Sequence, residues 1–182
     1  MYDSCEYESA MLGTLTLAAD SQGLRGLWLG GQKYFGGTLD APMQPCAPDA
    51  NPHLVAACAW LDRYFAGKRP DPAELSLAPI GSDFRQTIWQ LLLEIPCGET
   101  RTYGDLGREA AKRLGKMRMS SQAVGGAVGH NPISIIIPCH RVVGATGSLT
   151  GYAGGISKKL ALLEFEGVET GGFFIPAKST AP

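Results

Sequence analysis

The residues of this sequence best suited to covalent chemistry are a cysteine and a histidine, Cys139 and His140, which follow each other directly after a proline. A thiol is a strong nucleophile only as the thiolate, and a nearby base is the usual means of forming it. Neighbouring side chains of an extended chain point to opposite faces, so this pair could communicate only through a turn or a bridging water. The commoner meaning of such a pair is a buried cysteine beside a surface histidine, and the spacing is compatible with both.

A carboxylate near the end of the chain favours the nucleophile interpretation. A helix is predicted from about residue 156 to 166, and on its wheel Glu166 falls between the apolar Leu162 and Leu163. A carboxylate inside an apolar stripe is costly unless it is paired, and His140 would be a suitable partner in a Cys–His–Glu relay. The alternative is a glutamate at the edge of the stripe that reaches water near the helix end.

The loop between these residues could fold over a ligand. Residues 147–155 are rich in glycine and contain Tyr152, so they could cover a flat molecule or serve as a plain connector. No Gly-Lys-Ser/Thr sequence follows, and nucleoside triphosphate binding is therefore not supported.

Two features upstream would suit contact with nucleic acid. Five basic residues lie within residues 108–118, opposed only by Glu109, which indicates either a solvated surface or a phosphate-contacting patch. The next predicted helix, from Ser120 or Ser121 to Gly129, consists mostly of small residues. Its three glycines would cost about 1 kcal/mol each relative to alanine, so they need a reason. Close packing against another helix or close approach to a nucleic acid would supply one.

Composition limits the class of protein. The 182 residues are 45% hydrophobic and 18% charged, which excludes a disordered or collagen-like chain. No apolar run approaches the roughly 20 residues of a membrane span, and we expect no secretory signal. Five cysteines without paired spacing predict a reduced, cytoplasmic protein without a disulfide framework. The net charge of −1 conceals an asymmetry, because residues 1–82 carry −4 and residues 83–182 carry +3.

The elements that must position these residues fall into two halves. In the first half, alternation predicts two strands within residues 9–29, a loop over 30–50, and a helix from Asn51 to residue 65. Residues 68–82 contain three prolines and are predicted to form a linker. In the second half, helices are predicted at about 83–95, 103–111 and 120–129, and an apolar strand at 133–137 leads into Pro138. Two of these helices, joined by a loop, look like a helix-turn-helix.

The chain resembles a known family. The sequence PCHRV at residues 138–142, with Asn131 and Pro132 before it and GYAGG at 151–155 after it, closely resembles the O6-alkylguanine-DNA alkyltransferases. The resemblance is strong over about residues 83–168 and looser over residues 1–78. It implies an α/β fold, in which a small ribonuclease H-like domain of strand hairpin and helix (1–78) precedes a short linker (79–82). A mainly helical, winged helix-turn-helix-like domain (83–170) and a tail (171–182) would follow.

The resemblance implies a role for each matched residue. Cys139 corresponds to the thiol that accepts the alkyl group from guanine O6, His140 to the residue that deprotonates it through a water, and Glu166 to the carboxylate that orients the histidine. Asn131 corresponds to the asparagine that stabilises the turn around the acceptor. Tyr103 corresponds to the tyrosine whose hydroxyl supplies a proton to guanine N3 as the base leaves.

Contacts to the base and to DNA are implied in the same way. The carbonyls of Cys139 and Val142 would read the exocyclic amine, Tyr152 would form a wall of the pocket, and the amide of Ala153 would donate toward O6, beside Gly154. The small-residue helix would enter the minor groove, and the target base would be flipped out. The residues expected at DNA are Gln122, Ala123, Gly126, Ala127 and Arg118.

Two positions depart from the family pattern. The family often has an arginine that inserts into the base stack, and this position is Gln122 here. Some members bind zinc in the N-terminal domain, but only Cys5 has a counterpart, and the neighbouring ligand positions correspond to Asp20 and Arg25. We therefore expect no metal.

The resemblance implies a DNA repair protein that acts once. It would transfer alkyl groups from O6 of guanine, and from O4 of thymine, in double-stranded DNA irreversibly to its own cysteine. We expect a cytoplasmic monomer without cofactor or membrane partner. One alternative is a protein that recognises the lesion without repairing it, although Cys139 counts against it. The other is a Cys–His–Glu hydrolase, for which the sequence specifies no oxyanion hole beyond backbone amides.

Overall fold

The computed structural model describes residues 1–176, so the predicted tail at 171–182 lies partly outside the described residues. The chain divides into two compact units. The first consists of Met1–Ile80 and Pro132–Ile136, and the second of Gly81–Asn131 and the chain from Ile137 onward. The first unit is therefore completed by a short segment from the second half of the sequence.

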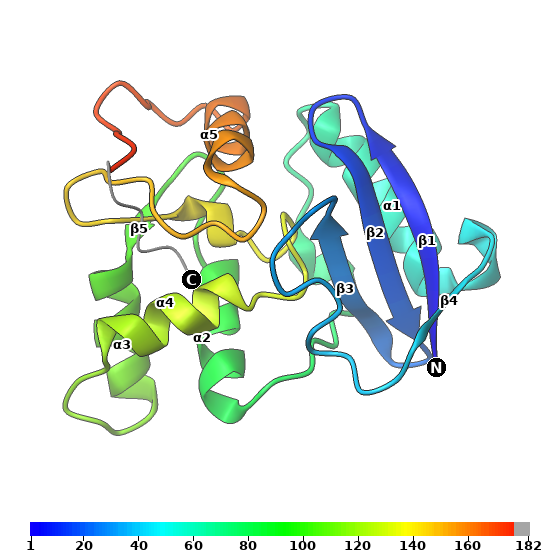
Figure 1. Ribbon diagram of the computed structural model, residues 1–182, viewed down its shortest axis with the longest axis horizontal. Coiled ribbons are helices and arrows are strands. Elements are labelled where there is room, and N and C mark those ends of the chain that lie inside the picture. The colour runs from blue at the N-terminus through cyan, green and yellow to red at the C-terminus, as the bar shows by residue number, and fades with distance from the viewer. Residues whose placement is uncertain (177–182) are drawn as a thin grey trace. The chain divides into compact units, whose positions relative to one another are not determined.

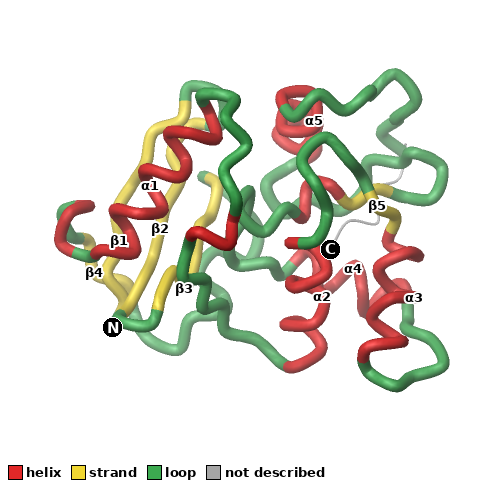
Figure 2. Tube along the Cα trace, turned by 180° about the vertical axis from the view of Figure 1, so that it is seen from behind, coloured by secondary structure: helices red, strands yellow, loops and turns green. Residues whose placement is uncertain are grey.

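The first unit is a four-stranded sheet with a helix across one face, as Figures 1 and 2 show from opposite sides. The strand order is β3-β2-β1-β4, with β4 parallel to β1 and the other pairs antiparallel. The elements are β1 (Tyr2–Ser9), β2 (Gly13–Asp20), β3 (Gly23–Leu29), β4 (Met43–Pro45) and α1 (Pro52–Phe65). The two strands predicted within residues 9–29 are confirmed as β2 and β3, whereas β1 and β4 were not predicted.

The core of this unit follows from the two periodicities of its elements. Leucines at alternate positions of β2 and β3 share one face of the sheet, and α1 buries a stripe at helical spacing. The fully buried leucines of these elements are Leu15, Leu17, Leu24, Leu27, Leu29, Leu54 and Leu61. The start of α1 is confirmed, because the Asn51 side chain accepts a hydrogen bond from the amide of His53 and Pro52 occupies the first turn.

Most of the predicted linker at residues 68–82 is not free. A short 3₁₀ helix, Pro72–Glu74, is capped by Asp71, whose carbonyl also accepts a hydrogen bond from the Trp60 indole at 3.1 Å. Leu77 then forms a bridge with Leu24 of β3. The helix α1 ends before these prolines, just ahead of Gly67, whose φ is 77°. The prolines do not detach the segment, because backbone hydrogen bonds fasten it to the sheet.

The predicted strand at residues 133–137 is wrong. Only Ile133 forms a bridge, to Leu27, whose amide donates to Pro132 and whose carbonyl accepts from Ser134, both at 2.8 Å. Ile135 then takes a φ of 71°, in the left-handed region that a β-branched residue rarely adopts, and the ladder stops. The apolar run reflects burial of this segment and not strand pairing.

The second unit is mainly helical, with a small two-stranded parallel sheet. Helices α2, α3 and α4 lie together and α5 lies beside the small sheet (Figure 1). Each of the first three begins at a side-chain cap, from Ser82, Thr102 and Ser120 respectively. The elements are α2 (Asp83–Leu93), β5 (Arg101–Thr102), α3 (Tyr103–Arg113), α4 (Ser121–Gly129), β6 (Val142–Val143) and α5 (Ile156–Phe165). The predicted helices are confirmed.

Candidate active site

The thiol of Cys139 lies in a buried turn. Pro138 precedes a single turn of 3₁₀ helix, Cys139–Arg141, so the cysteine and histidine are not in extended chain as a strand would require. The Asn131 side-chain amide donates to Cys139 Sγ at 3.1 Å and to the Ile137 carbonyl at 2.7 Å. Burial raises the pKa of the Cys139 thiol, and the hydrogen bond from Asn131 opposes this shift. Asn131 thus holds the turn and favours the thiolate.

The pairing predicted for Glu166 is confirmed. His140 Nε2 lies 2.9 Å from Glu166 Oε1, and both side chains are buried, so the alternative of a carboxylate that reaches water is wrong. Burial lowers the pKa of His140, which favours neutral imidazole. Because Glu166 accepts the Nε2–H, the lone pair falls on Nδ1, which is buried and has no hydrogen-bond partner within residues 1–176. Nδ1 is therefore the atom that can accept a proton.

A further charged residue completes this network and was missed from the sequence. Arg141 donates from Nε to Glu166 Oε2 at 2.7 Å and from Nη2 to Glu166 Oε1 at 2.8 Å, and its Nη1 donates to the Ile95 carbonyl. Burial alone would raise the pKa of Glu166, but the hydrogen bonds from His140 and Arg141 hold it well below its ordinary value. The sequence did contain a sign of this role, because Arg141 is a charged residue inside the apolar run that follows residue 133.

Lys159 was also missed. This lysine of α5 is fully buried, and its Nζ donates to the Val142 carbonyl and, at 3.1 Å, to the Thr150 carbonyl. Burial lowers its pKa to about 8. Its charge lowers the pKa of the Cys139 thiol, so the ammonium both fixes the loop and favours the thiolate.

The loop after Cys139 approaches the start of α3. The Tyr103 hydroxyl donates to the Thr150 carbonyl at 3.0 Å, and the Gly151 carbonyl lies 3.4 Å away. A side chain at Gly151, where φ is 65°, would come within 3.1 Å of that hydroxyl, which explains the glycine. Burial raises the pKa of Tyr103 to about 12, so it keeps its proton at neutral pH.

The residues expected to contact the base lie in the same loop. Tyr152 is buried, and its hydroxyl has no hydrogen-bond partner within the described residues. Ala153 and Gly154 are partly exposed beside it. The Cys139 carbonyl accepts a hydrogen bond from the Val142 amide, and the Val142 carbonyl accepts one from Lys159. Each carbonyl keeps only its second lone pair for a ligand.

The small-residue helix α4 presents an open face. A methyl group placed on Gly125 or Gly126 would meet nothing within 4 Å, so close helix packing does not explain these glycines. Gln122, Ala123 and Arg118 are exposed. Ala127, by contrast, is 3% exposed and its carbonyl accepts a hydrogen bond from the Trp89 indole, so its side chain faces the interior.

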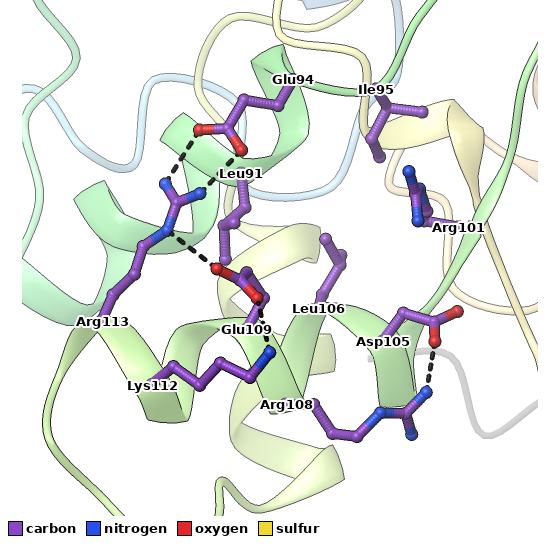
Figure 3. A pocket seen from close by; sticks show the side chains of 10 residues that line it. All are labelled: Leu91, Glu94, Ile95, Arg101, Asp105, Leu106, Arg108, Glu109, Lys112 and Arg113. Carbon is purple, nitrogen blue, oxygen red and sulfur yellow. Dashed lines mark hydrogen bonds and ion pairs between the residues drawn. The ribbon is translucent and has the colours of Figure 1, made fainter.

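Among the hollows in the described part of the second unit, two adjoin α3. One of about 360 Å³, shown in Figure 3, lies between α2 and α3 and does not include Cys139. Most of its charged side chains pair with one another, as Arg113 does with Glu94 at 2.7 Å and 2.8 Å. The other, of about 330 Å³, extends from Tyr103 along α3 to α4. Four basic residues line that second hollow: Arg108, Lys112, Lys116 and Arg118.

No group of three or more histidine, cysteine and acidic side chains within residues 1–176 is arranged to hold a metal ion. The two positions expected to replace zinc ligands form an ion pair, with Arg25 Nε 2.8 Å from Asp20 Oδ2. No helix in the described part of the chain is long and apolar enough to cross a membrane.

Both units match models of one family. Residues 5–79 match the 6-O-methylguanine DNA methyltransferase ribonuclease-like domain, and residues 83–168 match the DNA binding domain of the same family. The expected α/β fold of two domains is therefore confirmed.

Similar proteins agree with this assignment. The chain is 44% identical over 156 residues to a methylated-DNA–protein-cysteine methyltransferase of Mycobacterium tuberculosis, covering 85% of this chain and 87% of the relative. A relative of the same name from Methanosarcina acetivorans is 40% identical, covering 86% and 93%. Among solved structures, M. tuberculosis OGT in complex with DNA superposes with a TM-score of 0.72 at 40% identity, covering 91% of this chain and 93% of that one. The turn with its buried cysteine thus lies in a chain that belongs to the 6-O-methylguanine DNA methyltransferase family.

Proposed function

We propose that this protein repairs DNA by transferring an alkyl group from O6 of guanine to Sγ of its own Cys139, once per molecule. The observation that carries the proposal is the enclosed thiol, which accepts a hydrogen bond from Asn131 and adjoins a neutral histidine with a free Nδ1. The names of the relatives and the solved complex of one of them with DNA support it.

The first step is loss of the thiol proton. His140 Nδ1 accepts it through a water, while Nε2–H remains bonded to Glu166. Glu166 stabilises the imidazolium that forms, as a buried carboxylate does beside a catalytic histidine. Arg141 balances the carboxylate charge, so that His140 is neutral before the reaction. The thiolate that remains is stabilised by Asn131 and Lys159.

The second step is displacement at the alkyl carbon. A lone pair of the Cys139 thiolate forms the S–C bond while the bond from carbon to O6 breaks and its electron pair passes to the guanine. Tyr103 supplies a proton to guanine N3, after its hydroxyl turns from the Thr150 carbonyl. The product thioether has no good leaving group, so the protein does not turn over.

The guanine binds against the loop at residues 151–155. Tyr152 forms the wall of the pocket, and its unpaired hydroxyl is available to the ligand or to a water. Val142 reads the exocyclic amine with its remaining lone pair, together with the Cys139 carbonyl. The amide of Ala153 donates toward O6, and Gly154 leaves room for the alkyl group.

The outer face of α4 meets the DNA minor groove. Gln122, Ala123 and Gly126 form its contact surface, and the open space beside the glycines lets the backbone approach closely. Arg118 contacts phosphate. Ala127 supports this face from within, since its own side chain is buried.

The proposal also covers the substrate, the location of the protein and the organisation of its domains. We infer that the substrate is double-stranded DNA with a flipped O6-alkylguanine, and that O4-alkylthymine is accepted too. We expect a cytoplasmic monomer that needs no cofactor. The transfer and DNA-binding residues lie within 83–170, while 1–78 form a separate domain, joined by 79–82, and 171–182 form a tail.

Mass measurement of the intact protein after mixing with methylated duplex DNA tests this function. We expect one added methyl group per molecule, located by peptide mapping at Cys139 although four other cysteines are present. Cys139→Ser should abolish transfer, while the matched Cys97→Ser should not. A lesion-recognition protein would gain no methyl group, and a hydrolase would release many products per molecule; either outcome would overturn the proposal.

The role of Gln122 has its own test. Glutamine fills the gap left by a flipped base less well than arginine and lacks its charge, while extrusion of a base costs a few kcal/mol in duplex and much less in single strands. Gln122→Arg should therefore speed repair of duplex DNA and leave repair of free O6-alkylguanine unchanged. Gln122→Ala should slow duplex repair modestly. An unchanged duplex rate for Gln122→Ala would exclude this residue from holding the base out.

A further inference from the structure

A second pair of cysteines lies in the first unit, apart from the transfer site. Cys5 is on β1 and Cys58 is on α1, and both are free thiols. Cys5 is 6% exposed, and Cys58 is more accessible. This thiol pair, Cys5 and Cys58, is not used in the alkyl transfer.

One hydrogen bond on each side of the thiol pair fixes the register between β1 and α1. Alternation along β1 turns Asp3, the first thiol and Tyr7 toward one face. The Asn51 side chain at the start of α1 donates to Asp3 Oδ2 at 2.9 Å, and the Tyr7 hydroxyl donates to Asp62 Oδ1 at 2.8 Å. Cys58 lies one helical turn before Asp62, and Cys5 lies two residues before Tyr7 on the same face of β1. The two sulfurs therefore meet between these bonds.

The two thiols lie close enough to affect each other's ionisation. This coupling raises the pKa of the Cys5 thiol and lowers that of the Cys58 thiol. The more accessible Cys58 sulfur is the one that a reagent reaches first, while the buried Cys5 stands beside it. This is the arrangement of an attacking and a resolving thiol.

We propose that Cys5 and Cys58 form a redox-active dithiol that closes to a disulfide on reaction with a peroxide. The Cys58 thiolate attacks one peroxide oxygen and the O–O bond breaks, which gives a sulfenic acid and a hydroxide. The hydroxide takes up the proton that the Cys58 thiol lost and leaves as the first water. Cys5 then attacks the sulfenic sulfur, the S–O bond breaks, and the hydroxyl leaves as a second water with the Cys5 proton. The two sulfurs are oxidised by two electrons in all, and one hydrogen peroxide is reduced to two waters.

A third cysteine of the same unit supplies a matched control. The Cys46 amide donates to the Ser4 carbonyl at 2.8 Å, so Cys46 directly follows β4 and lies next to β1. It is partly exposed, as Cys58 is, but the two hydrogen bonds that set Cys5 opposite α1 do not involve it. If any nearby thiol could react with Cys5, Cys46 would compete with Cys58. If the register between β1 and α1 decides, Cys46 stays a free thiol.

Peptide mapping without reductant, after peroxide treatment of the full chain and blocking of free thiols, tests the proposal. We expect a cross-linked peptide that joins Cys5 to Cys58, reversed by dithiothreitol, together with a rise in Tm because the bond ties α1 to β1. Cys46→Ser should retain the cross-link and Cys58→Ser should lose it. Alkyl transfer by Cys58→Ser should be unchanged, which shows that the variant is folded.

Two results would overturn the proposal. One is recovery of Cys5 and Cys58 only as free thiols or as sulfonic acids after peroxide has oxidised other cysteines. The other is a cross-link of Cys5 to Cys46 in equal yield. Repeating the oxidation in denaturant provides the reference, because there the preference for the pair should disappear.

Discussion

Two arginine–glutamate pairs of the second unit have nearly the same geometry and different surroundings. Arg141 binds Glu166 through two hydrogen bonds of 2.7 Å and 2.8 Å, and Arg113 binds Glu94 through two of 2.8 Å and 2.7 Å. The side chains of the first pair are 10% and 1% exposed, and those of the second, drawn in Figure 3, are 36% and 55% exposed. Only the first carboxylate is shared with a histidine.

The comparison shows that burial, and not hydrogen-bond geometry, decides what such a pair does. At the surface, water and salt screen the attraction and the two side chains lose freedom, so the net gain is small. In the interior, either partner left alone would be an unpaired buried charge. The carboxylate of Glu166 therefore stays in place, and a histidine bonded to it keeps one orientation and one tautomer.

The largest difference is expected in the transfer rate. Glu166→Gln should slow alkyl transfer by about 10²- to 10⁴-fold, because it weakens the base, while DNA binding stays nearly intact. Glu94→Gln is the matched surface variant and should leave the rate unchanged. Stopped-flow measurement of transfer, with a separate binding titration, checks both. An equal loss of binding and transfer in Glu166→Gln would point to a structural role instead.

The next largest difference between the two arginine–glutamate pairs is expected in their contribution to folding stability. Arg141→Met leaves Glu166 buried without its counter-charge and should lower the free energy of unfolding by about 3–5 kcal/mol. Arg113→Met leaves an exposed carboxylate that water solvates, and the loss should stay below about 1 kcal/mol. Urea denaturation of the two variants measures the difference. Similar losses would mean that burial does not govern these pairs.

The stability of the fold should depend on pH through the buried network of His140 and Glu166. Folding lowers the pKa of His140 and of Glu166, so each stabilises the fold fully above its unfolded value, near 6.5 and 4.5. The unfolded chain binds more protons below those values, and stability falls as pH falls. We expect the loss to begin below about pH 6.5 and to steepen below about pH 4.5. In Glu166→Gln the steeper part should be clearly smaller, as measured by thermal unfolding across pH, and in Glu94→Gln it should change little.

Salt should produce the smallest effect. At about 1 M salt the screening length falls to about 3 Å, which weakens exposed pairs and reaches buried ones little. The small destabilisation by Arg113→Met should therefore shrink by a few tenths of a kcal/mol. The destabilisation by Arg141→Met should not change. Denaturation in urea at low and high salt makes this test, and equal salt dependence would contradict it.

Helical periodicity explains both a success and an omission in α5. A carboxylate among leucines required a partner, and this argument correctly paired Glu166 with His140. The same wheel places Lys159 in line with Ile156 and Leu163, so the buried lysine could have been predicted. What periodicity cannot supply is the partner, because Lys159 binds backbone carbonyls and these carry no sequence signature.

Errors in the first unit have a different origin. The strand β1 was missed because Tyr2–Ser9 consists mainly of polar residues, and its side chains bind α1 through hydrogen bonds instead of an apolar face. The strand predicted after Pro132 was wrong because an isoleucine run suits any buried segment. Its left-handed residue, Ile135, is a tertiary effect that local preferences oppose.

The division of the chain has a consequence for synthesis on the ribosome. The sheet of the first unit pairs with Pro132–Ile136 through Leu27, yet this segment leaves the ribosome long after β3 does. Domains usually fold as units, N-terminal first, as they emerge. Here the N-terminal unit is completed late, and the edge of β3 around Leu27 stays open until most of the second unit has been made. A nascent chain stalled before residue 132 should therefore be a better chaperone substrate than one stalled after residue 136.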